Sequence, residues 1–107
     1  TDDMIISAGY NIAGPEVEGA LLTHPAVAEC AVVGMEDPKW GEAVCAFIVK
    51  AENAQLDESA VLALFKDRVA KYKHPRRVLF VDNLPRNAMG KVQKFDLKRM
   101  AGRQANG

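Results

Sequence analysis

The sequence predicts an α+β domain: a small mixed sheet of about three strands covered by helices, with an N-terminal two-stranded hairpin. Two stretches, 27–33 and 43–49, are rich in Val and Ala and too apolar for strands with one solvated face. Apolar residues at helical spacing, introduced by a proline or an acidic residue, mark segments that can cover such a sheet. Short apolar runs on both sides of Ala8-Gly9 indicate the hairpin.

Length and charge limit the range of functions. With 107 residues, the chain 1–107 is one domain, large enough for a single core but too small for a large ligand cavity of its own. Its 14 basic residues balance 14 acidic ones, so we expect no nucleic-acid partner and no charged membrane surface. No apolar run approaches the roughly 18 residues of a membrane helix, so no membrane span is predicted.

The two cysteines are expected to be buried and reduced. Cys30 and Cys45 lie inside apolar runs, without a Cys-x-x-Cys spacing or a His cluster. This pattern favours free thiols over a disulfide or a metal site, so no metal ligands are predicted. We therefore expect a cytoplasmic protein.

The N-terminal part of the chain is expected to form the hairpin and a first helix. Runs 4–7 and 10–12 can pair, with Gly9 supplying the unusual dihedral of an outward-pointing turn. Pro15, followed by carboxylates near the positive end of the helix dipole, is typical of a helix start. The helix should end before Pro25.

A polar segment, 34–42, separates the two apolar strands. We expect it to be a loop long enough to reach another domain. It carries Trp40, the only tryptophan of the sequence. An exposed tryptophan on a loop favours a binding role. The alternative, that the ring folds back onto the sheet edge, has about equal weight.

A second helix is predicted to open at Asp57 and to end before Pro75. Its apolar face is formed by residues at helical spacing. They are Val61, Leu62, Phe65, Val69 and Tyr72. Lysines near its end suit the negative end of the helix dipole.

The remaining segments are a strand, a helix and a tail. The strand, 77–81, would complete a right-handed crossover if it runs parallel to 43–49. A short helix is expected over 93–100. The tail, 102–107, has the composition of a disordered chain end.

The turn-rich segment 85–94 presents a lysine directly behind a glycine. Pro85 and Asn87 are turn formers, and Gly90 can take a positive φ that lets the backbone approach a ligand. Lys91 is then a mobile positive charge at a loop tip, suited to an anionic oxygen. The alternative is a solvated lysine after a hairpin turn. A P-loop is excluded, because proline replaces its first glycine and valine follows the lysine.

Two motifs resemble those of one enzyme family. Residues 2–12 and 15–18 (DDMIISAGYNI and PEVE) are similar to the hinge-and-hairpin motif of the adenylate-forming enzymes. These include acyl-CoA and aryl-CoA synthetases, luciferases and peptide-synthetase adenylation domains. The loop that ends in Gly90-Lys91 is similar to the family's C-terminal lysine motif. In this order and separation, the motifs make the chain resemble the small C-terminal domain of an AMP-forming acid-thiol ligase.

This resemblance implies a mobile lid that works in two orientations on a larger N-terminal domain. That domain holds ATP, its magnesium ion and the carboxylic acid substrate. Lys91 matches the catalytic lysine, which contacts the carboxylate and the α-phosphate while the acyl-adenylate forms. Asp2 matches the hinge about which the lid rotates. Ala8 and Gly9 then line the tunnel for the phosphopantetheine thiol.

The resemblance to aryl-CoA ligases also implies contacts with the nucleotide of coenzyme A. Tyr72 can stack under the adenine, and Trp40 aligns with another CoA-contacting position. His74, Arg76 and Arg77 can meet phosphate groups. The alternative is a helix C-terminus whose positive charges interact favourably with the helix dipole.

The leading interpretation is the C-terminal domain of an acyl-CoA or aryl-CoA synthetase that uses ATP and coenzyme A. An adenylation domain that loads a carrier protein is the alternative with related chemistry, and a non-catalytic interaction module is the alternative from another class. The chain begins at Thr1, inside the hinge motif, so we expect the large domain upstream and no activity from this chain alone. Residues 7–12 resemble those of benzoate-type and medium-chain ligases.

Overall fold

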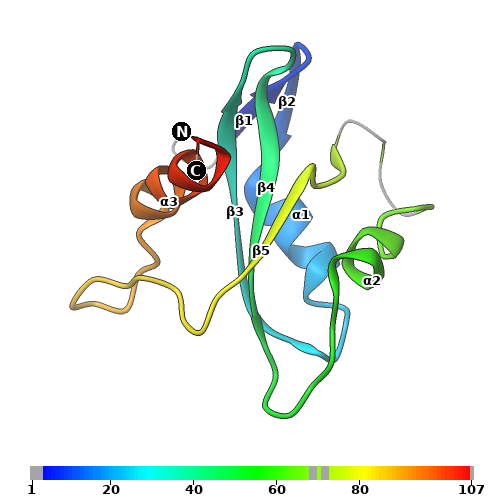
Figure 1. The fold of residues 1–107 in the computed structure, drawn as a ribbon, viewed down its shortest axis with the longest axis vertical. Coiled ribbons are helices and arrows are strands. Elements are labelled where there is room, and N and C mark those ends of the chain that lie inside the picture. Colours follow the sequence, from blue (N-terminus) through cyan, green and yellow to red (C-terminus); the bar gives the residue numbers. More distant parts are fainter. Residues whose placement is uncertain (1–3, 68–69, 71–72, 107) are drawn as a thin grey trace.

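A computed structural model describes residues 4–67, 70 and 73–106 (Figure 1). These residues contain five strands and three helices. They are β1 Met4–Ser7, β2 Tyr10–Ala13, α1 Gly14–Leu21, β3 Val27–Asp37, β4 Gly41–Lys50, α2 Glu58–Ala63, β5 Arg77–Phe80 and α3 Lys94–Asn106. The predicted α+β class is confirmed, and the strands are the expected sheet strands plus the hairpin pair.

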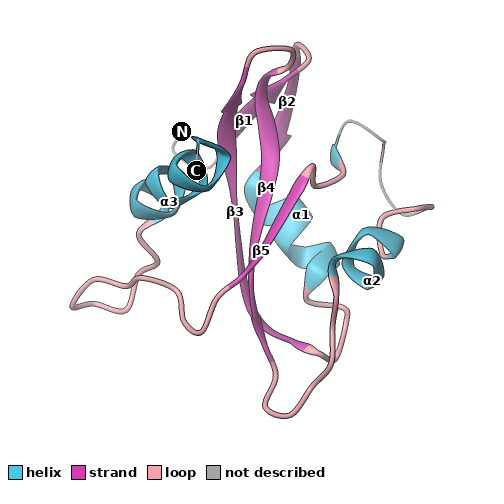
Figure 2. Cartoon of the chain, in the orientation of Figure 1, coloured by secondary structure: helices cyan, strands magenta, loops and turns pink. Residues whose placement is uncertain are grey.

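The strands form one mixed sheet in the order β2-β1-β4-β3, with β5 also paired to β4 (Figure 2). All pairs are antiparallel except β4 and β5, which run parallel from Cys45↔Arg77 to Ile48↔Phe80. The parallel pairing on which the predicted crossover depends is therefore confirmed. β4 has strand neighbours on both of its edges, which makes it the centre of the sheet.

Helices cover both faces of this sheet, α3 on one side and α1 with α2 on the other (Figure 1). Consecutive residues of β4 alternate between two buried clusters. Val44 and Ala46 pack in the cluster that includes α1 and α2, whereas Cys45 and Phe47 pack in the cluster that includes α3. Because side chains alternate across a strand, a strand covered on both faces is apolar at every position. This explains the uninterrupted apolar run in the sequence.

The segment 34–42 is not the long loop that its polar composition suggested. β3 runs to Asp37 and β4 begins at Gly41, so only a short turn joins them. Asp37 Oδ1 accepts hydrogen bonds from the N–H groups of Lys39 (2.8 Å) and Trp40 (2.9 Å), and Gly41 adopts a φ of 83°. These features tighten the turn, so the two strands stay paired up to their polar ends.

The second helix, α2, is shorter than predicted. Asp57 caps it as expected, because its carboxylate accepts a 2.8 Å hydrogen bond from the Ala60 N–H. Beyond Ala63 the chain tightens into turns, and the Phe65 N–H bonds to the Leu62 carbonyl, a closer spacing than in an α-helix. The predicted continuation through Val69 and Tyr72 lies outside the described residues.

The other two helices begin near the expected positions. Pro15 lies in the first turn of α1, which ends ahead of Pro25 as predicted. α3 begins at Lys94 and continues to Asn106, so it includes most of the tail that composition suggested to be disordered. Within the described residues, every helix is too short or too polar to traverse a bilayer.

Candidate functional site

The turn between β1 and β2 has the positive φ predicted for Gly9, and Ala8 shares it. Both residues have positive φ, 53° for Ala8 and 83° for Gly9, the combination that suits a two-residue hairpin between twisted strands. Ser7 pairs with Tyr10 at the end of the ladder. A side chain built at Gly9 would meet no atom within 4 Å, so the turn faces open space.

This turn lies beside the turn between β3 and β4 (Figure 1). The Ala8 N–H donates a 2.8 Å hydrogen bond to the carbonyl oxygen of Trp40. One residue along, Ser7 pairs with Gly41. The predicted thiol-channel turn and the predicted nucleotide-binding tryptophan therefore meet at one end of the sheet.

Arg76 is the third predicted residue at this place. Its guanidinium carbon lies 4.7 Å from the centroid of the Trp40 ring, and the Lys39 Nζ atom lies 5.2 Å from the same centroid. Trp40 is half-buried and Arg76 is exposed. The Trp40 ring is thus only partly covered. The cationic groups of Lys39 and Arg76 both lie over it. We call Ala8, Gly9, Trp40 and Arg76 the turn cluster.

The segment before β5 is anchored at Arg76 itself and at His74. The Arg76 N–H donates to the Val44 carbonyl (2.8 Å), and the His74 ring lies 5.8 Å from the ring of Phe65 in the core. His74 is half-buried and takes part in a core contact, whereas the neighbouring Arg76 reaches the turn cluster. Among the other predicted site residues, Asp2 and Tyr72 lie outside the described residues.

Lys73 adds a contact that the sequence did not suggest. Its Nζ atom lies 2.6 Å from Glu16 Oε2 and 3.1 Å from Glu16 Oε1. Glu16 belongs to α1, which directly follows the hairpin. The ion pair therefore ties the segment that leads to Arg76 to the helix behind the hairpin.

The loop that carries Lys91 is held by its own hydrogen bonds. Asn87 Oδ1 accepts from the N–H groups of Met89 and Lys91, both at 2.9 Å. The Asn87 N–H donates to the Lys91 carbonyl (3.0 Å), and Arg86 forms a bridge with Val92. The side chain of Lys91 is exposed. The Lys91 side chain is therefore exposed at a loop tip, as predicted, and hydrogen bonds hold the backbone that carries it.

Arg86 connects this loop to the sheet. Its guanidinium donates to the Gly90 carbonyl (2.7 Å) and to Glu29 Oε1 on β3 (2.5 Å). Sequence reasoning did not assign Arg86 a role, and its position next to the turn-forming Pro85 and Asn87 was the only available signal. Gly90 has a φ of 84°, as the sequence suggested.

A second anchor holds the start of α3. The Lys94 Nζ atom lies 2.7 Å from Glu18 Oε2, and each side chain is only 19% exposed. The same carboxylate oxygen accepts a 2.9 Å hydrogen bond from the Val32 N–H on β3. Glu18 thus fixes the helix that follows the Lys91 loop against α1 and the sheet, and it is another residue that sequence reasoning missed.

Both cysteines are free, as predicted, and Cys45 is buried, whereas Cys30 is only half-buried. Burial raises the pKa of the Cys30 thiol from 9.0 to about 12, with the Glu18 carboxylate adding to the rise and Lys94 opposing it. Burial also raises the pKa of Cys45 from 9.0 to about 11, against the opposing charge of Arg77. Such thiols stay protonated near neutral pH and are poor nucleophiles.

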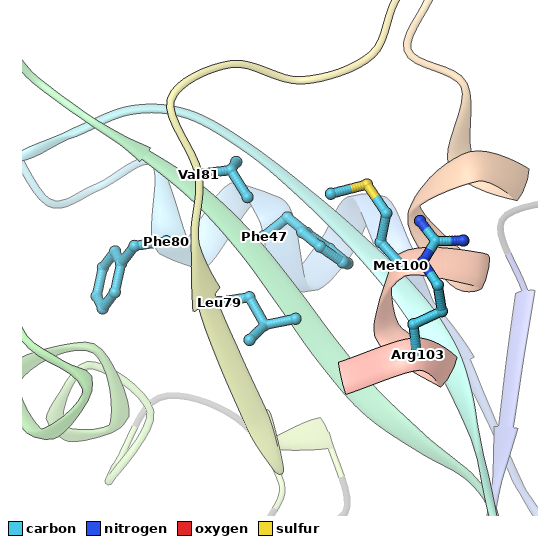
Figure 3. Close-up of a pocket in the computed structure, with 6 residues that line it drawn as sticks. All are labelled: Phe47, Leu79, Phe80, Val81, Met100 and Arg103. Atoms are coloured by element: carbon cyan, nitrogen blue, oxygen red, sulfur yellow. The ribbon is translucent and has the colours of Figure 1, made fainter. Parts of the chain in front are cut away.

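A shallow pocket of about 180 Å³ lies between β5 and α3, beside the ring of Phe47 (Figure 3). Its lining is mostly apolar. The lining residues are Phe47, Leu79, Phe80, Val81, Met100 and Arg103. None of the predicted site residues lines it, so it does not correspond to the candidate site.

Residues 16–91 match the protein family described as AMP-binding enzyme C-terminal domain. An indoleacetate–CoA ligase of Aromatoleum aromaticum is 47% identical over 102 residues, which cover 95% of this chain and 20% of that protein. The structure of ATP-bound MatB from Rhodopseudomonas palustris superposes with a TM-score of 0.90 at 40% identity, covering 92% of this chain and 20% of MatB.

The o-succinylbenzoate CoA synthetase from Bacillus subtilis, solved with its acyl-adenylate intermediate, is also similar. It superposes with a TM-score of 0.84 at 45% identity, covering 90% of this chain and 19% of that protein. The chain thus spans about a fifth of the length of the relatives it matches. Its fold, its motifs and the family match agree, and the chain belongs to the AMP-binding enzyme C-terminal domain family.

Proposed function

We propose that this chain is the mobile C-terminal domain of an AMP-forming acid–CoA ligase. The ligase activates a carboxylic acid with ATP to an acyl-adenylate and then forms the CoA thioester. The match of residues 16–91 to the family and the CoA ligases among the similar proteins support this reaction class. ATP and coenzyme A are the cosubstrates, and the magnesium ion and the acid are held by an N-terminal domain outside this chain.

Lys91 serves the first half-reaction. A carboxylate oxygen of the acid attacks the α-phosphorus of ATP, and the bond from that phosphorus to the pyrophosphate oxygen breaks. Negative charge is redistributed around the α-phosphate as this happens, and an ammonium group nearby stabilises it. The exposed Lys91 side chain on a backbone held by Asn87 is suited to this task, because a fixed backbone reduces the cost of placing the charge.

The turn cluster serves the second half-reaction. The sulfur of CoA attacks the acyl carbon, AMP leaves with the electron pair of the broken C–O bond, and the thiol proton passes to solvent. Ala8 and Gly9 line the channel for the pantetheine arm, since the turn offers backbone without bulky side chains. Trp40 and Arg76 bind the nucleotide end by stacking and charge, and Tyr72 and His74, which are close to Arg76 in the sequence, contribute to the same binding.

The separation of these two surfaces is the observation that carries the proposal. Arg76 precedes β5 and the Lys91 loop follows it, so the two surfaces are reached from opposite ends of that strand. The four residues of β5 between these two segments span roughly 13 Å along the strand. We infer that one orientation of the domain does not serve both surfaces, that the domain turns between the two steps, and that Asp2 is the turning point.

The test is a pair of single-turnover assays with the full-length enzyme that carries this domain. Pyrophosphate release over a panel of carboxylic acids reports adenylate formation, and thioester formation from a supplied acyl-adenylate reports the second step. Both steps are expected with free CoA. Acyl transfer to a carrier protein but not to CoA would favour the alternative acceptor, and pyrophosphate release from no acid would favour an interaction module.

The hinge has its own test. Asp2→Pro fixes φ at that position and should trap one orientation. One half-reaction should then survive while the other is lost. If both half-reactions survive in Asp2→Pro, Asp2 is not the hinge.

A further inference from the structure

The hydrogen-bonded ladder that joins the hairpin to the rest of the sheet is short. Strand β1 pairs with β4 only at Ser7↔Gly41. Hydrogen-bonding groups alternate sides along a strand, so the N–H groups of Ile6 and Ala8 point the same way. The Ala8 N–H donates to the Trp40 carbonyl. The Ile6 N–H instead donates to a side-chain oxygen, Glu42 Oε1, at 2.9 Å.

The Glu42 carboxylate is itself held from two directions. Its other oxygen, Oε2, lies 3.3 Å from the Nζ atom of Lys98 on α3. A Cβ atom built on Gly34 of β3 would lie 2.5 Å from Oε2 and 2.7 Å from the carboxyl carbon. The Glu42 carboxylate therefore occupies the space that any side chain at position 34 would fill. Because Gly34 has no side chain, the carboxylate can reach the Ile6 N–H.

We propose that Glu42 is a positioning residue for the thioester-forming step. It acts through the backbone of Ile6 to hold the Ala8–Gly9 turn against Trp40, and Gly34 supplies the space that this requires. The inference rests on the proposed function, in which that turn lines the thiol channel. It assigns a role in one half-reaction to a residue that lies outside the predicted site.

The hydrogen bond to Ile6, more than the ion pair with Lys98, carries this role. A carboxylate that accepts from a backbone N–H forms a charge-assisted bond, stronger than one between neutral groups. The Lys98 side chain is 46% exposed, and exposed ion pairs contribute little. Glutamine at position 42 keeps an oxygen for Ile6 and loses most of the ion pair, which makes it the conservative variant.

The kinetic test uses the full-length enzyme and its two half-reactions. In Glu42→Ala, thioester formation from supplied acyl-adenylate should slow roughly tenfold, because a shifted turn misplaces the thiol. Pyrophosphate release should change by less than about twofold, because it does not use this turn. Glu42→Gln should recover most of the loss. Glu36→Gln, at the cross-strand partner of Glu42, is the matched control and should leave both rates unchanged.

A double-mutant cycle tests the part played by Gly34. Gly34→Ala should slow thioester formation in the natural background by displacing the Glu42 carboxylate. In the Glu42→Ala background the same change should have no further effect, since no carboxylate remains to be displaced. Gly19→Ala is the control, because a methyl group there meets no atom within 4 Å. Additive effects of the two changes would overturn the role of Gly34.

Hydrogen exchange in the full-length enzyme gives a readout that does not depend on turnover. Peptides covering residues 4–10 should exchange faster in Glu42→Ala and near the natural rate in Glu42→Gln. Unchanged exchange, or equal loss of both half-reactions in Glu42→Ala and Glu42→Gln, would overturn the positioning role. Failure of the unaltered enzyme to form adenylate would instead overturn the proposed function, so the two failures are distinguishable.

Discussion

The guanidinium of Arg76 lies over the ring of Trp40, with its central carbon 4.7 Å from the ring centroid. Trp40 is the last residue of the turn between β3 and β4, and Arg76 directly precedes β5. Their contact brings a flat aromatic surface and a positive charge to the end of the sheet where the Ala8–Gly9 turn lies. That combination is suited to an adenine ring and its phosphates.

We predict that Trp40→Ala and Arg76→Ala each raise the KM for CoA by about tenfold in the full-length enzyme, a loss of binding shared by ground and transition states. The KM values for ATP and acid should change little. The double variant should lose less than the sum of the two, because the side chains act together. Steady-state kinetics checks this, with Lys50→Ala, which removes a lysine stacked on Phe80, as the control. Unaltered CoA affinity would leave the contact with a structural role only.

Lys91→Ala should lower the rate of adenylate formation about 10²- to 10³-fold, since it removes a charge that acts in that transition state. Thioester formation from supplied acyl-adenylate should be preserved. Single-turnover assays of each step make the comparison, and Lys66→Ala, another exposed lysine, serves as control. An equal loss in both steps would mean that the lysine supports the fold or the interface.

Asn87→Ala should reduce adenylate formation by roughly tenfold, because the loop that presents Lys91 loses both bonds to the Asn87 side chain. Asn87→Asp keeps the acceptor oxygen and should recover most of the rate. Thermal unfolding should shift little in either variant, since the loop is exposed. A large stability loss with no difference between the two variants would contradict the positioning argument.

A bulkier residue at Gly9 should act on the other step. Asparagine adopts positive φ more readily than other side-chain-bearing residues, so Gly9→Asn adds bulk with less backbone strain than another substitution would. A Cβ atom at this position meets no atom within 4 Å in this domain, so folding should be largely preserved. Thioester formation should slow while pyrophosphate release stays nearly intact. The reverse pattern, measured in the same single-turnover assays, would exclude the turn from the thiol channel.

Stability should fall at alkaline pH because of the two thiols. In the folded chain their pKa values are about 12 for Cys30 and about 11 for Cys45, against 9.0 ordinarily. Between pH 9 and those values the unfolded chain loses the thiol protons and the folded chain keeps them, so unfolding is favoured as pH rises. Urea titrations at increasing pH should show this decline, and a Cys30→Ala, Cys45→Ala variant should show a weaker one. A decline of the same slope in that variant would exclude the thiols as its cause.

The local elements could be predicted from the sequence because short-range patterns decide them. Gly9 indicated the hairpin turn, Pro15 the start of α1, and the apolar run 43–49 the central strand. Lys91 was recognisable for the same reason, since a lysine behind Gly90 in a turn-rich segment is a local feature. The polar segment 34–42 misled the same reasoning, because strand pairing and the Asp37 turn outweighed its composition.

By itself, the sequence determined where most of the helices and strands begin and which side chains are chemically able to act, although it did not fix where β3, α2 and α3 end. Only the tertiary structure decided that Ala8, Trp40 and Arg76 share one end of the sheet, and that Glu18 and Glu42 anchor Lys94 and Ile6. The physical reason is the range of the interactions along the chain. Propensity and periodicity arise from interactions within a few residues, whereas a carboxylate far along the chain reaches a backbone N–H only after the sheet has brought both strands together.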